Sequence, residues 1–323
     1  MEQIPRASSL TNIDLMFSAL TQPNYPNAAL GLRSDGVTAL SLQKQGRGQY
    51  GIKQAATVSL PVGLLTPGFL DANISNPGEF AACLEEAVMS AGLLRQKRWS
   101  IALPSNTART AILTLEAEPA AKAEAEEILD WKAEQSFGAP AAELRISKQS
   151  IEPDRDGKAR YFATAIKLSV IDEYENIFER FGWKAGLMLP RAVSEANWLI
   201  DRKSFGDSML ISGQNDGFTA LLLRGNEPSV VRSVTCEQSE IDDEIYRLLM
   251  FYSDRFGGDA GGTLERMLII GRDLIPTKIK DIAAEALGSV TQILRPDEVG
   301  LNMPDNSFSF NEIAAPAGLA ALG

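Results

Sequence analysis

Apolar and polar residues alternate in short runs near the start of the chain, a pattern typical of antiparallel strands. Residues 28–32 and 37–42 are separated by the turn Arg33-Ser34-Asp35-Gly36, and an Asp-Gly pair between two such runs is a strong hairpin signal. A third strand is expected over residues 50–60. The pattern therefore predicts a three-stranded meander at the beginning of the fold.

Further along the chain, apolar residues recur every three to four positions, which predicts amphipathic helices. The helix expected over residues 76–92 has Asn76 as its N-cap, Pro77 at its first position and Gly92 at its end. The other expected helices are 119–137, 169–181, 241–256 and 275–287. The expected strands are 99–103, 110–115, 144–151, 160–166, 209–212, 219–223, 229–234, 267–270 and, as the final strand, 290–294.

The meander pattern occurs a second time in the C-terminal half. The strands at 209–212 and 219–223 flank a turn from Gly213 to Gly217, and a third strand and a helix follow. Two meander-plus-helix blocks predict an internal duplication, although the two copies share little residue identity. An actin-like fold requires this layout.

Composition and charge narrow the functional classes. The chain has 323 residues, of which 45% are hydrophobic and 23% charged, which indicates a folded globular protein with room for two domains. The net charge of -11 disfavours nucleic-acid binding, because an acidic surface repels phosphates. The tight basic cluster Arg95-Gln96-Lys97-Arg98 is interpreted as a solvated helix end.

The chain has no histidine and two distant cysteines, Cys83 and Cys236. A Ser-His-Asp triad, a Cys-His pair and a zinc site with imidazole ligands are therefore excluded. Both cysteines are interpreted as small core residues of a protein in a reducing compartment. No apolar run approaches the ~18 residues that span a bilayer, and residues 1–22 do not resemble a signal peptide. A cytoplasmic protein is expected.

One helical stretch carries a family resemblance. Residues 126–137 read E-E-I-L-D-W-K-A-E-Q-S-F and precede Pro140 and Glu143-Leu144. Further motifs follow in order at 162–166, 181–183, 243–252, 268–271 and 315–320. Together these motifs resemble PilM, the actin-like protein of type IV pilus assembly, over most of residues 28–323. A reduced actin-like body is also expected in the type II secretion protein GspL, but that family continues into a transmembrane helix, so we favour the PilM-like interpretation.

The resemblance implies an α/β, actin-like (ribonuclease H-like) two-lobed fold, with a small α/β subdomain inserted in the first lobe. Residues 1–27 would be a lead-in segment, and residues 28–98 plus 190–205 the first lobe. Residues 99–189 would form the inserted SHS2-like subdomain. Residues 206–323 would form the second lobe, with most of the nucleotide-closing subdomain missing between Arg232 and Ile241.

The nucleotide turns of the family are eroded in this chain. The first turn lacks its leading acid, the second has Ser212 or an apolar residue in place of an Asp, and Arg272 replaces a second glycine after Gly271. The candidate cofactor-binding residues are Ser34, Asp35, Gly36, Gly213, Asp216 and Gly271. The two acids also fit plain turn chemistry, which is the preferred interpretation. The glycine-rich loop 257–262 is interpreted as a connection. We therefore expect no catalytic residue, no metal site and no cofactor, with Mg²⁺-ATP as the alternative ligand.

The resemblance implies a scaffold or adaptor, a pseudo-ATPase at the inner face of the inner membrane. Its partners would be the cytoplasmic tail of a PilN-like membrane protein and the assembly ATPase, with membrane contact through the partner only. The alternatives are an ATP-binding switch or weak ATPase, and an actin-like polymer former. Trp131 and Trp183 could anchor a partner peptide, but both are interpreted as core residues.

Overall fold

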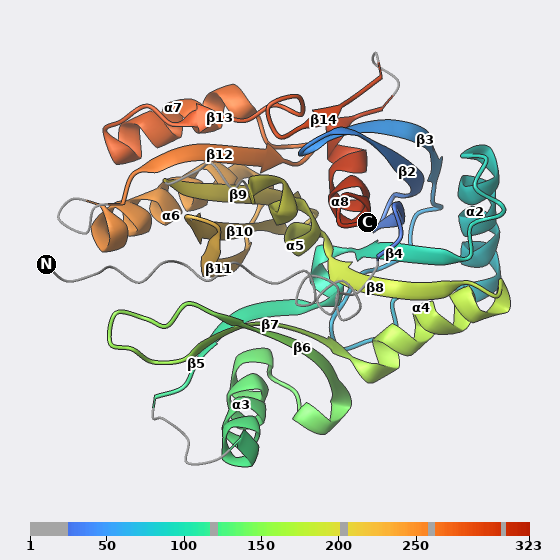
Figure 1. Cartoon of the computed structure of the whole chain (residues 1–323), viewed down its shortest axis with the longest axis horizontal. Helices are drawn as coiled ribbons and strands as arrows, with labels where there is room; N and C mark the ends of the chain where they lie inside the picture. Colours follow the sequence, from blue (N-terminus) through green and yellow to red (C-terminus); the bar gives the residue numbers. More distant parts are fainter. Residues whose placement is uncertain (1–24, 117–121, 201–205, 258–261, 305–307) are drawn as a thin grey trace, which may run out of the picture.

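The computed structural model describes residues 25–116, 122–200, 206–257, 262–304 and 308–323. Two large sheets form two lobes, and a third, smaller sheet lies against both of them (Figure 1). Of the expected lead-in, residues 1–24 lie outside the described residues. In the part that is described, no helix is both long and apolar enough to cross a bilayer.

The first-lobe sheet has the order β14-β3-β2-β1-β4-β8. Its strands are β1 (Ala28–Arg33), β2 (Gly36–Gly46), β3 (Gln49–Ser59), β4 (Arg98–Leu103), β8 (Lys184–Pro190) and β14 (Leu301–Asn302). The first three strands pair antiparallel, as the alternating pattern predicts, and β4 and β8 continue the sheet in parallel with β1. Helices α2 (Pro77–Ser90) and α4 (Leu168–Arg180) pack on one face. As expected, the Asn76 side chain caps α2 by accepting from the N–H groups of Gly78 and Glu79.

The second-lobe sheet repeats this plan in the order β11-β10-β9-β12-β13. Its strands are β9 (Asp207–Gln214), β10 (Gly217–Arg224), β11 (Glu227–Thr235), β12 (Leu264–Ile270) and β13 (Gln292–Ile293). Helices α6 (Ile241–Phe256) and α7 (Pro276–Leu287) cover one face, and a short turn η4 (Gln238–Glu240) precedes α6. The internal duplication predicted from the meanders is confirmed, because both sheets place the meander beside parallel strands.

The small sheet has the order β5-β7-β6 and comes from the chain between β4 and β8. Its elements are η1 (Ser105–Thr107), β5 (Arg109–Thr114), α3 (Lys122–Phe137), η2 (Ala141–Glu143), β6 (Leu144–Ile151) and β7 (Arg160–Lys167). Leu129, Ala133 and Phe137 of α3 are buried on its core side. Residues 117–121, where the helix was expected to begin, lie outside the described residues.

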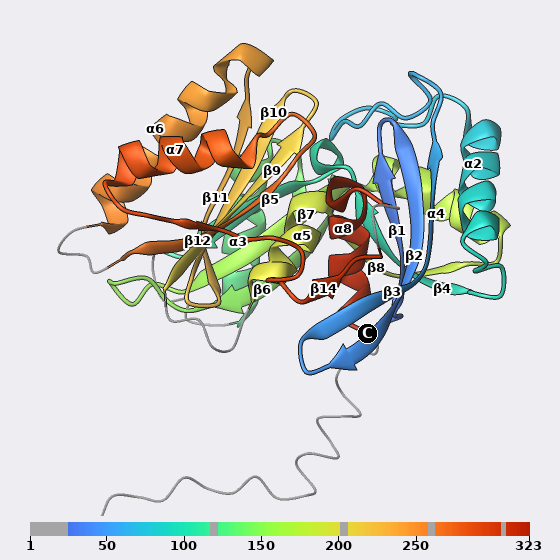
Figure 2. The same ribbon diagram turned by 90° about the horizontal axis from the view of Figure 1, so that it is seen from above.

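Two helices lie between the large sheets, as Figure 2 shows from above. They are α5 (Arg191–Ala196), continued by η3 (Asn197–Leu199), and α8 (Phe310–Ala320). They approach so closely that a Cβ on Gly318 would lie 2.2 Å from the carbonyl oxygen of Ser194. One core cluster joins both lobes through α8, with Leu40 from the first sheet and Leu210 from the second.

The expectation that residues 290–294 form the final strand is wrong. There β13 covers only Gln292–Ile293, and the chain then returns to the first lobe, where β14 pairs with Tyr50 and Gly51 of β3. A two-residue strand is too short to show alternation. Helix α8 is apolar on nearly all sides and contains Pro316. Because this helix is buried between the lobes, it lacks the amphipathic pattern of a surface helix.

Candidate functional site

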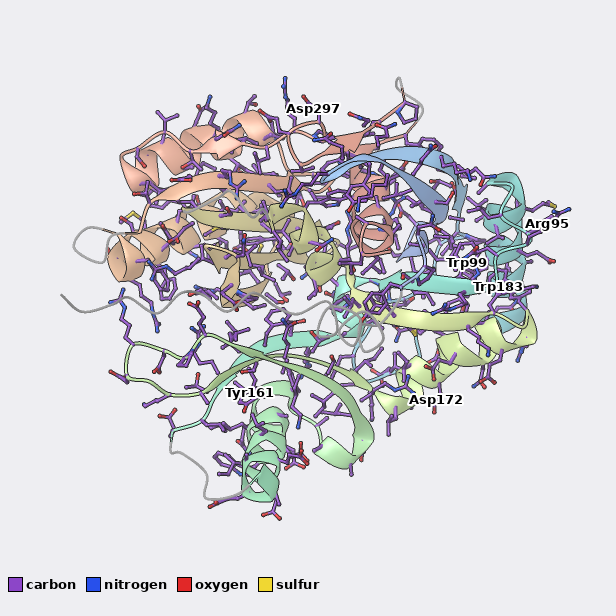
Figure 3. The ribbon with its side chains drawn as sticks, viewed as in Figure 1. Arg95, Trp99, Tyr161, Asp172, Trp183 and Asp297 are labelled. Carbon is purple, nitrogen blue, oxygen red and sulfur yellow. The ribbon has the colours of Figure 1, made fainter. Side chains whose placement is uncertain are left out.

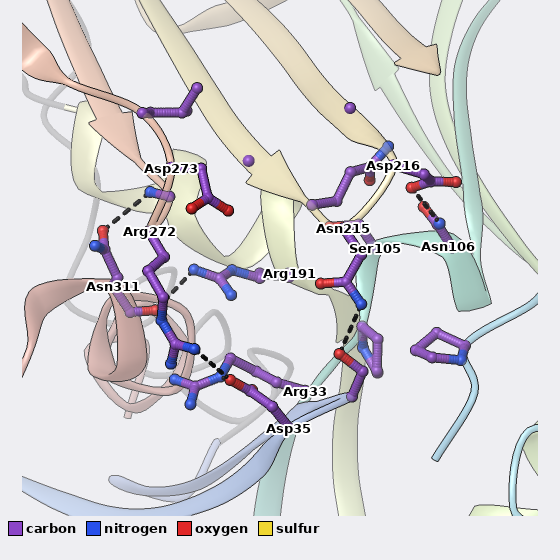
Figure 4. A pocket seen from close by; sticks show the side chains of 18 of the residues that line it. Arg33, Asp35, Ser105, Asn106, Arg191, Asn215, Asp216, Arg272, Asp273 and Asn311 are labelled. Carbon is purple, nitrogen blue, oxygen red and sulfur yellow. Dashed lines mark hydrogen bonds and ion pairs between the residues drawn. The ribbon is translucent and has the colours of Figure 1, made fainter. Parts of the chain in front are cut away.

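The corresponding turns of the two lobes face each other across a cavity of about 350 Å³. The β1–β2 turn brings Asp35 to one side, and the β9–β10 turn brings Asn215 and Asp216 to the other (Figure 4). Ser34, next to Asp35 in the first turn, also lines the cavity. The lining also includes residues that follow β4 and β12, residues at the starts of α5, α6 and α8, and Thr66 and Pro67 from the loop between β3 and α2. The duplicated hairpins thus place two Asp-Gly turns at one interlobe site.

The Asp35 carboxylate is held by arginines from both lobes. The Arg33 Nε lies 2.9 Å from one oxygen of Asp35, and the Arg272 Nη1 lies 2.9 Å from the other. Glu312 on α8 lies near both guanidinium groups, at 3.5 Å from Arg33 and 3.8 Å from Arg272. Partial burial raises the pKa of Asp35, but the hydrogen bonds and charges of Arg33 and Arg272 outweigh burial, so its pKa lies below the ordinary value.

Two side-chain hydrogen bonds with amide donors also join the lobes. The Asn215 side-chain amide donates to the Ser34 hydroxyl at 2.8 Å, and the Asn106 amide donates to the Asp216 carboxylate at 2.9 Å. Asn106 follows β4, whereas Asp216 lies in the second-lobe turn. These two bonds and the Asp35–Arg272 ion pair are called the interlobe polar contacts below.

The two site glycines allow β9 and β12 to come together at the cavity wall. A Cβ on Gly213 would lie 3.2 Å from the Cα of Gly271, and a Cβ on Gly271 would lie 3.1 Å from the Cα of Gly213. The Gly271 N–H donates to the Asn311 side-chain oxygen at 2.9 Å, which ties the end of β12 to α8. The structural role of Gly213 and Gly271 is therefore to let the backbones at the ends of β9 and β12 approach each other closely.

A buried ion pair lies beneath the cavity. The Arg191 Nε donates to Glu195 at 2.6 Å, and its Nη2 donates to the backbone oxygen of Asn311 at 2.7 Å. The Glu195 side chain is fully buried, and burial raises its pKa, although the charge of Arg191 acts in the opposite direction. Arg191 lines the cavity, but it is already engaged on two sides.

The structure brings five of the six sequence-predicted site residues to the cavity: Ser34, Asp35, Gly213, Asp216 and Gly271. Gly36, the remaining one, follows Asp35 in the same turn but does not line the cavity. The sequence interpretation missed the partners of these residues, which are Arg33, Asn106, Asn215, Arg272 and Asn311, and it also missed Arg191 in the cavity lining. Proximity to a predicted turn was a usable signal for Arg33, Asn215 and Arg272, whereas nothing near Asn106 or Arg191 in the sequence marks them.

The described residues do not fit a metal–phosphate site. Mg²⁺ in nucleotide sites is held through carboxylates and phosphates, yet Asp35 is engaged by two arginines and Asp216 by an amide. Within the described ranges, no three Cys, Asp or Glu residues are grouped so that they could hold a metal ion. Strand β11 leads to α6 with only residues 236–240 between them. Of the glycine-rich loop 257–262, residues 258–261 lie outside the described residues.

The two candidate tryptophan anchors have different environments. Trp183 is buried and its ring centroid lies 5.6 Å from that of Trp99, so its interpretation as a core residue is confirmed (Figure 3). Trp131 on α3 is 59% exposed, so the same interpretation is wrong for it. The buried positions of α3 recur at Leu129, Ala133 and Phe137, and Trp131 lies off that stripe.

No family model matches the sequence, and no curated protein matches it. Among solved structures, a chain of the "PilM-PilN type IV pilus biogenesis complex" is similar with a TM-score of 0.71 and 16% identity, over 93% of this chain and 98% of that chain. The chain has a PilM-like, actin-like fold. This likeness and the two matching sheets agree with the fold expected from the sequence motifs.

Two weaker similarities were also found. A Bacteroides thetaiotaomicron protein of actin-like ATPase fold and unknown function has a TM-score of 0.45 and 12% identity, over 89% of this chain and 93% of that chain. The cytoplasmic domain of EpsL, an inner-membrane component of the type II secretion system of Vibrio cholerae, has a TM-score of 0.47 and 10% identity, over 90% of this chain and 94% of that chain.

Proposed function

We propose that this protein is a non-enzymatic scaffold of a type IV pilus or type II secretion-like assembly, and that it binds the cytoplasmic tail of a PilN-like inner-membrane protein. The PilM-like fold supports this proposal, because the similar structure is that of a PilM–PilN complex. The protein would act at the cytoplasmic face of the inner membrane, where the assembly ATPase is a further proposed partner.

The pairing of the site's own side chains is the observation that carries the non-enzymatic part of the proposal. An ATPase needs acids that remain able to orient a hydrated metal ion and water. Here Asp35 is paired with Arg33 and Arg272, and Asp216 accepts from Asn106. The Asp35–Arg272 and Asn106–Asp216 contacts join the lobes without a ligand, so a metal–nucleotide complex that used either acid would compete with them.

Calorimetric titration with tail peptides of PilN-like membrane proteins tests the partner. We expect saturable binding of at least one tail peptide and none of a peptide with the same composition in scrambled order. If a broad set of such tails releases no heat and does not raise the melting temperature of the protein, the adaptor proposal is wrong.

An ATP-regulated switch is the second candidate, and one observation favours it. The cavity of about 350 Å³ is lined by Arg33, Arg191 and Arg272, whose guanidinium groups are suited to phosphate oxygens. A ligand that paired with Arg272 would compete with Asp35 and so change the contact between the lobes.

Titration with Mg²⁺-ATP separates the two candidates. On the scaffold proposal we expect no binding tighter than ~100 μM, which corresponds to roughly 5.5 kcal/mol. Tighter binding, together with phosphate release that disappears in Asp216→Ala, would establish the switch instead. The ATP and tail-peptide titrations are independent, so each proposal can fail by itself.

A further inference from the structure

The end of the first lobe opposite the cavity carries an unusual concentration of positive charge. Strands β4 and β8 begin at this end and run in parallel toward the cavity, so Arg98 and Lys184 start neighbouring strands in register. The Lys184 N–H donates to the backbone oxygen of Lys97 at 2.7 Å. Two basic segments, 95–98 and 180–184, therefore lie side by side on this end.

Six basic residues form this surface, which is called the basic end below: Lys44, Arg95, Lys97, Arg98, Arg180 and Lys184. All six are exposed. Lys44 and Arg98 line a shared hollow of about 360 Å³, and its lining contains no Asp or Glu. Of the neighbouring acids, Glu179 is exposed and directly precedes Arg180 at the end of α4, and Glu86 lies on α2. This local charge stands against a net charge of -11 for the whole chain.

Two large apolar side chains are exposed next to these charges. Met89 in the last turn of α2 is 56% exposed, and Leu94 in the following turn is 55% exposed. Figure 3 shows Arg95 at the outer edge of the first lobe, close to Trp99 and Trp183. Both tryptophans are buried, so the basic end does not use them as stacking surfaces.

We propose that the basic end docks directly on anionic phospholipid headgroups. Lys and Arg side chains attract an anionic bilayer surface, and exposed Met and Leu side chains can enter the interface beside them. A single-stranded nucleic acid shares the negative charge, and its binding sites combine positive charge with aromatic stacking surfaces. Tyr25 and Tyr50 line the hollow but are only partly exposed, whereas Met89 and Leu94, the large apolar side chains exposed beside the charges, are aliphatic. The lipid is thus the better fit.

This contact is additional to the partner-mediated membrane association of the proposed function and does not depend on it. Docking by this end would turn the cavity away from the bilayer, because the cavity lies at the other ends of β4 and β8. The C-terminal residue Gly323 and the tip of the β2–β3 hairpin lie at the same end as the hollow (Figure 2).

Co-sedimentation of the full chain with vesicles tests the proposal in the absence of any protein partner. We expect binding to phosphatidylglycerol-containing vesicles that weakens as salt is raised, and little binding to phosphatidylcholine alone. The triple variant Arg95→Glu, Lys97→Glu, Lys184→Glu should lose at least about tenfold in affinity for these vesicles. A second variant, Met89→Ser with Leu94→Ser, should lower binding at high salt as well, because it removes the apolar part of the contact.

The control triple, Arg155→Glu, Arg247→Glu, Lys280→Glu, makes the same change in net charge at exposed positions away from the basic end. It should bind vesicles almost as well as the wild type. The proposal is overturned if both triple variants lose the same affinity for vesicles. It is also overturned if the protein binds both kinds of vesicle equally, or if it binds single-stranded DNA more tightly than vesicles. Unchanged circular dichroism and melting temperature ensure that a weak binder is still folded.

Discussion

The two lobes have sheets of the same plan but differ in what was added to them. The first lobe has an inserted subdomain between β4 and β8 and a sixth strand, β14, at its edge. The second lobe has neither addition and passes from β11 to α6 within five residues, 236–240. The repeated pattern thus determines the strand order of both sheets, and the additions leave the two equivalent turns facing each other across the cavity.

The two equivalent Asp-Gly turns also differ between the lobes, in the partners of their aspartates. Asp35 forms ion pairs with Arg33 and with Arg272 of the opposite lobe. Asp216 accepts a hydrogen bond from the uncharged amide of Asn106. The dipeptide is identical, so its turn-forming role does not determine its electrostatic role. The partners contributed by the other lobe determine it.

The largest expected effect tests whether the lobes unfold together. Trp99→Ala in the first lobe and Phe218→Ala in the second each remove a fully buried side chain, which should lower the free energy of unfolding by about 3–5 kcal/mol. Because one core cluster spans both sheets and α8, both variants should shift one shared transition in chemical denaturation. Trp131→Ala, at an exposed position, is the control and should change stability by less than about 0.5 kcal/mol. Two transitions that move separately would show that the lobes are independent.

A matched pair of glycines tests the difference between the turns. Gly217 has a φ of 134°, and a Cβ there would lie 2.0 Å from the backbone oxygen of Val234. At Gly36 the nearest atom, the oxygen of Val58, would be 3.1 Å away. Gly217→Ala should therefore cost about 2–3 kcal/mol and Gly36→Ala about 1 kcal/mol or less, as measured by thermal unfolding. Equal costs would mean that the two turns are more alike than their geometry indicates.

The Asp35–Arg272 ion pair and the Asn106–Asp216 hydrogen bond, whose donor is uncharged, should respond differently to salt. Arg272→Ala removes an ion pair whose side chains are 66% and 45% exposed, so it should cost at most about 1 kcal/mol, and less at high salt. Asn106→Ala should cost a similar amount that does not depend on salt, because it removes a neutral donor. Denaturation curves at low and high sodium chloride measure both. A salt-independent cost for Arg272→Ala would contradict an ionic role.

The smallest expected effect is a pH dependence at Asp35. Its pKa in the folded protein lies below the ordinary value of 3.8, so its ion pairs stabilise the fold at higher pH. That contribution is lost as the pH falls through the folded-state pKa. Asp35→Asn should therefore be slightly less stable than the wild type near neutrality, and the difference should vanish in acid. A difference that grows as the pH falls would contradict this sign.

Local sequence determined the strands, the turns and most helices, because their signals are short-ranged. Asp35-Gly36 and Asp216-Gly217 mark turns from two residues each, and Asn76 and Pro77 mark the start of α2. The family resemblance grouped the two turns as one candidate site, and the structure places both turns at one cavity. The positions of the site residues were therefore within reach of the sequence.

The partners of those site residues could not be predicted from the sequence. Arg272 lies far from Asp35 in the sequence, and Asn106 far from Asp216, so only the packing of the lobes brings each pair together. Helix α8 was missed because burial on nearly all sides removes the amphipathic period. Trp131 was misread because its aromatic character was given more weight than its place off the buried stripe of α3.

The return of the chain to the first lobe has a mechanical consequence. The polypeptide crosses between the lobes once after η3 and again between β13 and β14, so two covalent connections join the same two bodies. A single cut in either crossing would therefore leave the two lobes covalently tethered by the other.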